Sequence, residues 1–147
     1  MPRVTTNWLP RCSPISASSR CRSTTSPPPP GDWHSYQHAV EKYVGPSGFM
    51  LFAVLDHGVW ISKAGIERKV LRVILGNPLI AITMIRHDVT AGLFAPPVEL
   101  LILDEGTGSS LTYVKPSSLM VVEPNRPLLE AAEALDAKLA ALAAKVV

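Results

Sequence analysis

The segment VILGNPLIAITMIRHD, residues 73–88, is the most apolar stretch of the chain and decides which fold the sequence predicts. From Val73 to Ile85 it has 13 residues, fewer than the roughly 20 that a membrane-spanning helix needs. Gly76-Asn77-Pro78 also interrupts it, because Asn is a good helix N-cap and Pro is favoured at the first helical position. The segment therefore predicts the end of a strand, a capped turn and a buried helix running to about His87, with no membrane span.

Apolar runs on both sides of this segment predict several short strands. Continuous or alternating patterns indicate strands at 48–56, 68–76, 98–105 and 110–115, and a short edge strand at 120–123. The strands at 98–105 and 110–115 are joined by GTGS, so they should form a hairpin. The connection at 58–67 is expected to be a loop that brings Trp60 and Ile61 onto the core.

Two further helices are predicted near the ends of the domain. The first runs from Trp33 to about Val44 after the N-cap Asp32, and the last runs from Arg126 to about Lys145 after Asn125. In the last helix apolar residues recur at spacings of three and four, which gives one continuous seam. The seam comprises Leu128, Ala132, Leu135, Leu139, Leu142 and Val146. Together these patterns indicate a single α+β domain.

Residues 1–31 differ in composition from the rest of the 147-residue chain. They are rich in Ser, Thr, Pro and Arg, have few large apolar residues, and end in a polyproline run that marks a domain edge. They are therefore predicted to be a disordered tail, and residues 32–147 the folded domain. The Arg- and Ser-rich composition also suits an organelle transit signal, which leaves a mitochondrial location open beside a cytoplasmic one.

Several of the basic residues and both cysteines lie in the tail, and this excludes some functions for the folded domain. The tail holds four arginines and no acidic residue, so the other 10 basic residues face all 12 acidic ones. A slightly acidic body argues against a nucleic-acid partner, which would need clustered Lys and Arg. Cys12 and Cys21 both lie in the tail, which excludes thiol catalysis and thiolate metal sites in the domain.

Three stretches, taken in order, resemble the domain-of-unknown-function 302 family. GFMLFAVLDHG, residues 48–58, is similar to the family's Gly-Phe-x-x-Phe-x-x-Ile-Asp-His segment, and ILGNPLIAITMI, residues 74–85, to its Phe-Gly-Asn-Pro segment. PPVELLILDEG (96–106) followed by LTYVKPSSL (111–119) resembles the strand–turn–strand ending of the family. The resemblance covers about residues 45–143.

The resemblance implies a β-α-β-β-β-β-α order, with helices packed on an antiparallel sheet as in TATA-box-binding-protein-like domains. It also implies homodimers, and it implies no known activity. The strand that should precede the helix at Trp33 is either RVTTNWL, residues 3–9, or absent.

Two Asp–His pairs are the main candidates for chemistry. Asp56-His57 follows a predicted strand, and His87-Asp88 ends a predicted helix. If the two ends meet, one imidazole could act as a base oriented by a neighbouring carboxylate. The alternative is that each pair ties down a turn, since Asp side chains often cap local backbone.

A weaker pattern lies on the first helix. His34, His38 and Glu41 recur at i, i+4 and i+7, which could present two imidazoles and a carboxylate to a metal. A solvated polar face explains the same spacing. GTGSS, residues 106–110, sits in a hairpin rather than between a strand and a helix, so no phosphate-binding loop or cofactor is predicted.

The sequence thus predicts a cytoplasmic, homodimeric, non-enzymatic module that binds a small ligand or a protein partner. The alternative is an acid–base enzyme or metal-binding protein centred on Asp56, His57 and His87.

Overall fold

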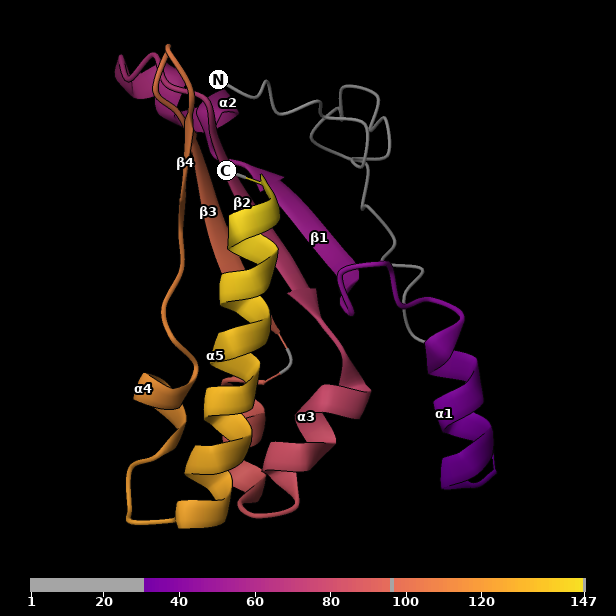
Figure 1. The fold of residues 1–147 in the computed structure, drawn as a ribbon. Coiled ribbons are helices and arrows are strands. Elements are labelled where there is room, and N and C mark those ends of the chain that lie inside the picture. The colour runs from indigo at the N-terminus through magenta and orange to yellow at the C-terminus, as the bar shows by residue number, and fades with distance from the viewer. Residues whose placement is uncertain (1–30, 96, 147) are drawn as a thin grey trace.

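The computed structural model describes residues 31–95 and 97–146 (Figure 1). The strands are β1 (Met50–Asp56), β2 (Val70–Gly76), β3 (Val98–Asp104) and β4 (Ser109–Thr112). The helices are α1 (Trp33–Glu41), α2 (Gly58–Ile61), α3 (Pro78–Ile85), α4 (Ser117–Met120) and α5 (Arg126–Val146). Two 3₁₀ turns, η1 (Ser62–Ala64) and η2 (Val89–Leu93), complete the order. The predicted α+β class is confirmed. The predicted tail and its strand candidate at 3–9 lie outside the described residues.

The four described strands form one antiparallel sheet in the order β1-β2-β3-β4. The central pair β2 and β3 places Val73 opposite Leu100 and Leu75 opposite Val98. A bulge between Leu51 and Ala53 shifts the register of β1 against β2. Residues that are paired across two strands point to the same face of the sheet, and successive residues of one strand point to opposite faces. Val73 and Leu100 therefore share one face, whereas Arg72 and Leu101, which precede and follow them in the sequence, lie on the opposite, outer face.

Figure 1 shows α5 lying across the first of these faces, and α3 following the end of β2 beside the N-terminal half of α5. Buried residues of both helices belong to the core on this face. The predicted seam of α5 is confirmed, because its four central residues are buried in the main core cluster. They are Leu128, Ala132, Leu135 and Leu139. They meet buried side chains of β2, β3 and α3, including Val73, Leu100 and Met84. Burial of each large aliphatic side chain contributes about 1.5–3 kcal/mol, so this layer dominates the stability of the domain.

Helix α1 stands apart from that core. Val40 and Met50 are buried, yet neither belongs to the main cluster. Met50 neighbours Leu51, which packs on the core, so strand alternation directs Met50 to the outer face. Trp33 on α1 and Tyr43 just after it are about half exposed. Helix α1 also ends at Glu41, earlier than the predicted Val44.

Asn77 joins the start of β1 to the start of α3. Its Oδ1 accepts a hydrogen bond from the Leu79 N–H at 2.8 Å, which caps the helix as predicted. Its Nδ2 donates to the carbonyl of Gly48 at 2.9 Å. Only 8% of Asn77 is exposed, so both bonds satisfy polar groups that are largely removed from water.

One predicted strand is wrong. Residues 120–123 are not extended: Met120 ends α4, and 121–123 form a bend that leads toward α5. Met120 is buried in the core, whereas Val122 is 85% exposed. The apolar run Met-Val-Val therefore comprises the buried Met120, the partly buried Val121, which packs against the core, and the exposed Val122, and it is not a strand. Among the described helices, none is long and apolar enough to cross a membrane.

We expect Asn77→Ala to lower the free energy of unfolding by about 2–3 kcal/mol, because it removes a helix cap and leaves the Gly48 carbonyl without its partner. Urea denaturation measures the change. Asn125→Ala is the matched control, since Asn125 also caps a helix and donates to a carbonyl but is less buried. A loss at Asn77 no larger than the loss at Asn125 would contradict this role.

Candidate functional site

Asp56 and His57 lie where β1 passes into α2. Asp56 ends the strand, and its Oδ1 accepts a hydrogen bond from the Val59 N–H at 3.3 Å. The N–H of His57 donates to the Val70 carbonyl at 2.8 Å, which fixes the residue beside the start of β2. The carboxylate therefore caps the short helix α2, as one of the two sequence interpretations proposed.

The His57 ring is paired with Trp60. The indole Nε1 donates to His57 Nδ1 at 3.1 Å, and the two rings meet edge to face with centroids 5.9 Å apart. In this pair the indole N–H is the donor and the imidazole Nδ1 the acceptor. Trp60 is 61% exposed, so the prediction that the 58–67 loop brings it onto the core is wrong. Three consecutive apolar residues on a four-residue helix point in different directions and cannot all face one core. This pattern in the sequence could have indicated that one of them is exposed.

An open hollow of about 590 Å³ lies between α2 and the chain that leads into β2. We call it the α2 hollow. From α2 and η1 it is lined by Gly58, Val59 and Ser62, and from the other side by Asp56, Glu67, Arg68, Lys69 and Leu71. Its wall thus combines two basic and two acidic side chains with apolar surface, a mixture suited to binding an amphipathic molecule.

Gly58 allows α2 to approach the opposite wall of this hollow. A Cβ at this position would lie 2.9 Å from the Arg68 carbonyl oxygen and 3.0 Å from Asp56 Oδ1. Both distances are too short for nonbonded carbon and oxygen atoms. The missing side chain of Gly58 therefore sets the width of the α2 hollow at this end.

The basic residues of the hollow already have acidic partners on β3 or just beyond it. Arg68 Nη2 lies 2.7 Å from Glu105 Oε2, and Lys69 Nζ lies 3.4 Å from Asp104 Oδ2. The pKa of Asp104 is lowered from its ordinary value, first by the Gly106 N–H and then by Lys69. The Lys69 side chain is 87% exposed, so its ammonium group remains accessible to a ligand.

His87 and Asp88 lie at the other end of the sheet. Because β1 and β2 are antiparallel, α3 starts at the end of the sheet where β1 begins, whereas His57 follows the end of β1 (Figure 1). The length of β2, about 20 Å, separates these two ends. The structure therefore does not bring the two Asp–His pairs together, and the geometry that the acid–base hypothesis requires is not present.

Asp88 caps the 3₁₀ turn η2, which follows α3. Its Oδ1 accepts from the N–H of Thr90 at 2.8 Å and from the Thr90 hydroxyl at 2.6 Å, which caps η2. The two hydrogen bonds, chiefly the one from the hydroxyl, hold the pKa of Asp88 below its ordinary value. The carbonyl of His87 accepts from Asn125 Nδ2 at 3.3 Å, which ties this turn to the start of α5.

His34, His38 and Glu41 lie together on the exposed side of α1. The two imidazole rings meet edge to face with centroids 4.5 Å apart, and His38 Nδ1 is 3.4 Å from Glu41 Oε2. Within residues 31–95 and 97–146, no group of three or more His, Cys, Asp or Glu side chains could hold a metal ion. The three residues thus interact with one another rather than converge on a metal position.

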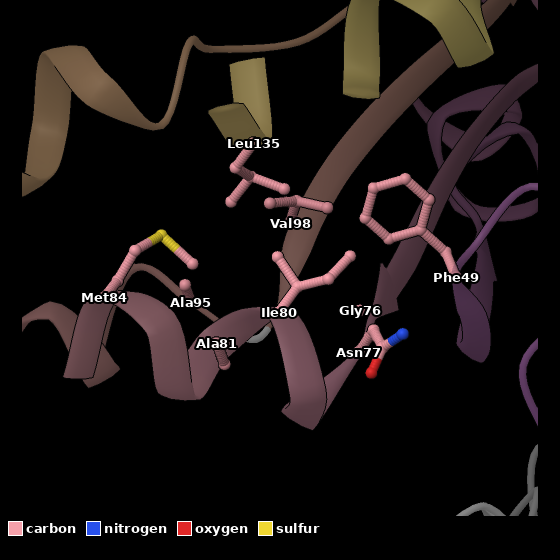
Figure 2. Close-up of a pocket in the computed structure, with 9 residues that line it drawn as sticks. All are labelled: Phe49, Gly76, Asn77, Ile80, Ala81, Met84, Ala95, Val98 and Leu135. Carbon is pink, nitrogen blue, oxygen red and sulfur yellow. The ribbon is translucent and has the colours of Figure 1, made fainter. Parts of the chain in front are cut away.

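A second, internal cavity lies beside Asn77, and Figure 2 shows the side chains that surround it. Its wall is almost entirely apolar and includes Phe49, Ile80, Met84 and Leu135. Its volume is about 10 Å³, which is no more than the space of one water molecule. It is therefore a packing defect of the core and not a ligand site.

We expect Gly58→Ala to lower the free energy of unfolding by about 1–3 kcal/mol, because the new methyl group must displace the Arg68 backbone. Urea denaturation gives the change. Gly92→Ala is the matched control, since its nearest neighbour would be Ile85 Cδ1 at 3.7 Å, an ordinary contact. Similar losses in the two variants would contradict the close approach at Gly58.

We expect Asp88→Asn to flatten the acid dependence of stability. Because the folded pKa lies below the ordinary value of 3.8, the carboxylate stabilises the fold above that value and loses this contribution as the pH falls through the folded pKa. Asn keeps the acceptor oxygen but cannot titrate. Unfolding free energies of the variant should change less than those of wild type between roughly pH 4 and pH 2. Asp88→Ala, which loses the cap, should be weaker at every pH, and an unchanged acid slope in Asp88→Asn would refute the assignment.

Comparison with known proteins places the chain in a family. A search of the curated proteins found no match. One solved structure, that of an uncharacterized conserved protein DUF302 from Bacillus stearothermophilus, is similar with a TM-score of 0.62 and 19% sequence identity. The similarity covers 73% of this chain and 84% of that one, and at this identity it shows a shared fold alone. The family model described as domain of unknown function DUF302 matches residues 25–146, so the chain belongs to the DUF302 family.

Proposed function

We propose that this DUF302 domain is a non-catalytic binding module and that its ligand occupies the α2 hollow. The observation that carries the proposal is the α2 hollow itself. Trp60 is not part of its lining, but it is exposed, is held by His57 and directly follows the lining residue Val59 on α2. An exposed indole held in place by a hydrogen bond offers a rigid apolar surface at small entropic cost.

The lining of the hollow favours a small amphipathic ligand. Its volume of about 590 Å³ lies within the range of small-molecule sites. Val59 and Leu71 supply apolar contacts, while the exposed ammonium group of Lys69 can receive an anionic group. By contrast, Asp56 is engaged in capping, and His57 is engaged with Trp60. These contacts suit binding better than proton transfer.

We further propose that the module works in the cytoplasm as a homodimer with a TATA-box-binding-protein-like architecture. A sheet that is covered by the long helix α5 on one of its faces supports this architecture. The partly exposed aliphatic residues on the other face, described below, support self-association.

The fluorescent anion 8-anilinonaphthalene-1-sulfonate is a suitable probe, because it joins an apolar ring system to one negative charge. We expect it to bind wild type, and Trp60→Ala or Lys69→Ala to weaken its affinity about fivefold or more, the effect of losing roughly 1 kcal/mol of contact. Fluorescence titration measures the dissociation constant. The Lys69 change should leave stability nearly unaltered, because exposed ion pairs contribute little.

Trp33→Ala is the matched control for Trp60→Ala. Trp33 is another half-exposed tryptophan but lies on α1, away from the hollow. Its replacement should leave the dissociation constant of the probe unchanged. If Trp33→Ala weakens the probe as much as Trp60→Ala, or if neither Trp60→Ala nor the lining variant Lys69→Ala affects it, the α2 hollow is not the binding site.

A further inference from the structure

The outer face of the sheet is made by the residues that alternate with the core positions. From β1 it carries Ala53 and Leu55, from β2 Val70, Arg72 and Ile74, from β3 Glu99, Leu101 and Leu103, and from β4 Ser110 and Thr112. Arg68 and Glu105 continue the same face just beyond the ends of β2 and β3. Below, "outer face" means this set of residues.

The outer face is unusually apolar for a solvated sheet surface. Antiparallel sheets that face water on one side normally place polar residues there. Here the central strands instead present Val70, Ile74, Leu101 and Leu103, all partly exposed, and Leu55 beside them is 41% exposed. Met50, at the beginning of β1, is a buried residue on this side of the sheet, 2% exposed.

The charges of the outer face are sorted by strand. The basic residues Arg68 and Arg72 belong to β2 and its approach, and the acidic residues Glu99 and Glu105 to β3 and its exit. Arg72 Nε donates to Glu99 Oε2 at 3.0 Å, and Arg68 pairs with Glu105 at 2.7 Å. These four side chains remain about half exposed, so each can also reach groups above the sheet. The face has no net charge but has a positive column beside a negative one.

We propose that the outer faces of two copies pack against each other, about a two-fold axis that runs parallel to the strands between β2 and β3. This inference rests on the homodimer of the proposed function and names its interface. Such an axis places β2 of one copy over β3 of its partner, at the same height along the strands. Arg68 then faces the partner's Glu105. Arg72 lies opposite the partner's Leu101 and one cross-strand pair away from the partner's Glu99, the same diagonal that it spans to Glu99 within its own chain.

The charge columns select this axis over the other two-fold arrangement. An axis perpendicular to the strands would lay β2 over β2 and β3 over β3, bringing like charges together. Like charges in direct opposition cost several kcal/mol at an interface. The parallel axis also brings the aliphatic residues of the two copies together, in the aligned packing that is common between β-sheets.

The size of the face predicts a weak dimer. Four strands about 4.8 Å apart and up to seven residues long give roughly 450 Å² a copy, or about 900 Å² for the pair. Stable interfaces usually bury about 1,600 Å². We therefore expect a dissociation constant in the micromolar range.

Reversing single charges on the outer face tests the interface. Mixing the two variants then separates charge repulsion from a failure to fold, because only folded variants can form a heterodimer. Arg72→Glu makes positions 72 and 99 both acidic, and Glu99→Arg makes both basic, so each variant by itself should dimerise at least tenfold more weakly than wild type. Mixed in equal amounts, the two variants should form a heterodimer, because an acidic face then meets a basic one. Sedimentation velocity over a concentration series, with native mass spectrometry of the mixture, measures both effects.

Two further variants control for indirect effects. Arg126→Glu makes the same charge change on α5, at a side chain that is 89% exposed and not on the outer face, and should dimerise as wild type does. Leu55→Glu changes an exposed residue near the rim of the outer face, and should disrupt the dimer even if the Arg72 and Glu99 variants do not fold.

The outcomes separate the interface from the dimer itself. A wild-type chain that dimerises while the charge variants and Leu55→Glu dimerise equally well would overturn the outer face as the interface and leave the proposed homodimer intact. Failure of the two folded variants to associate on mixing would overturn the parallel axis. A wild-type chain that stays monomeric at all concentrations would overturn both proposals, and some other cover for the outer face would then be required.

Discussion

The side chain of Asn77 holds together two parts of the chain that are 29 residues apart. Its side-chain oxygen Oδ1 accepts the hydrogen bond that caps α3, and its side-chain nitrogen Nδ2 donates to the Gly48 carbonyl in the turn before β1. Gly48 has a φ of +81°, a conformation that glycine adopts readily, so its carbonyl can point at Asn77. The close packing of α3, β1 and β2 depends on these two bonds, because a buried amide or carbonyl that loses its partner costs more than an average hydrogen bond contributes.

The link that Asn77 makes between β1 and α3 also determines where the two Asp–His pairs lie. Once α3 starts beside the beginning of β1, the antiparallel register sends the end of β1 to the far side of the sheet. Asp56 and His57 therefore lie at one end, and His87 and Asp88 at the other. Each pair then serves its own turn: Asp56 caps α2 and Asp88 caps η2. The separation follows from strand direction alone, so no side-chain movement of ordinary size would bring the pairs together.

Local signals in the sequence predicted most of the fold. The N-cap at Asn77 and the apolar seam of α5 depend on residues only a few positions apart, and both are confirmed. The errors arose where burial is decided by distant contacts. Trp60 and Val122 lie in apolar runs that could equally be core or surface, and only the placement of their neighbours in space exposes them. The α2 hollow was likewise out of reach, because its two walls come from segments whose approach depends on a clash-free Gly58.

One residue belongs to both of the surfaces that we propose. Arg68 lines the α2 hollow, and its guanidinium is also paired with Glu105 at the edge of the outer face. A ligand that drew Arg68 toward the hollow would leave Glu105 without its partner in the same chain and make that column of the outer face more negative. The charge balance between two copies would then change with ligand binding. By linkage, dimerisation would alter ligand affinity by the same factor, so this single ion pair would couple the two proposed activities of the domain.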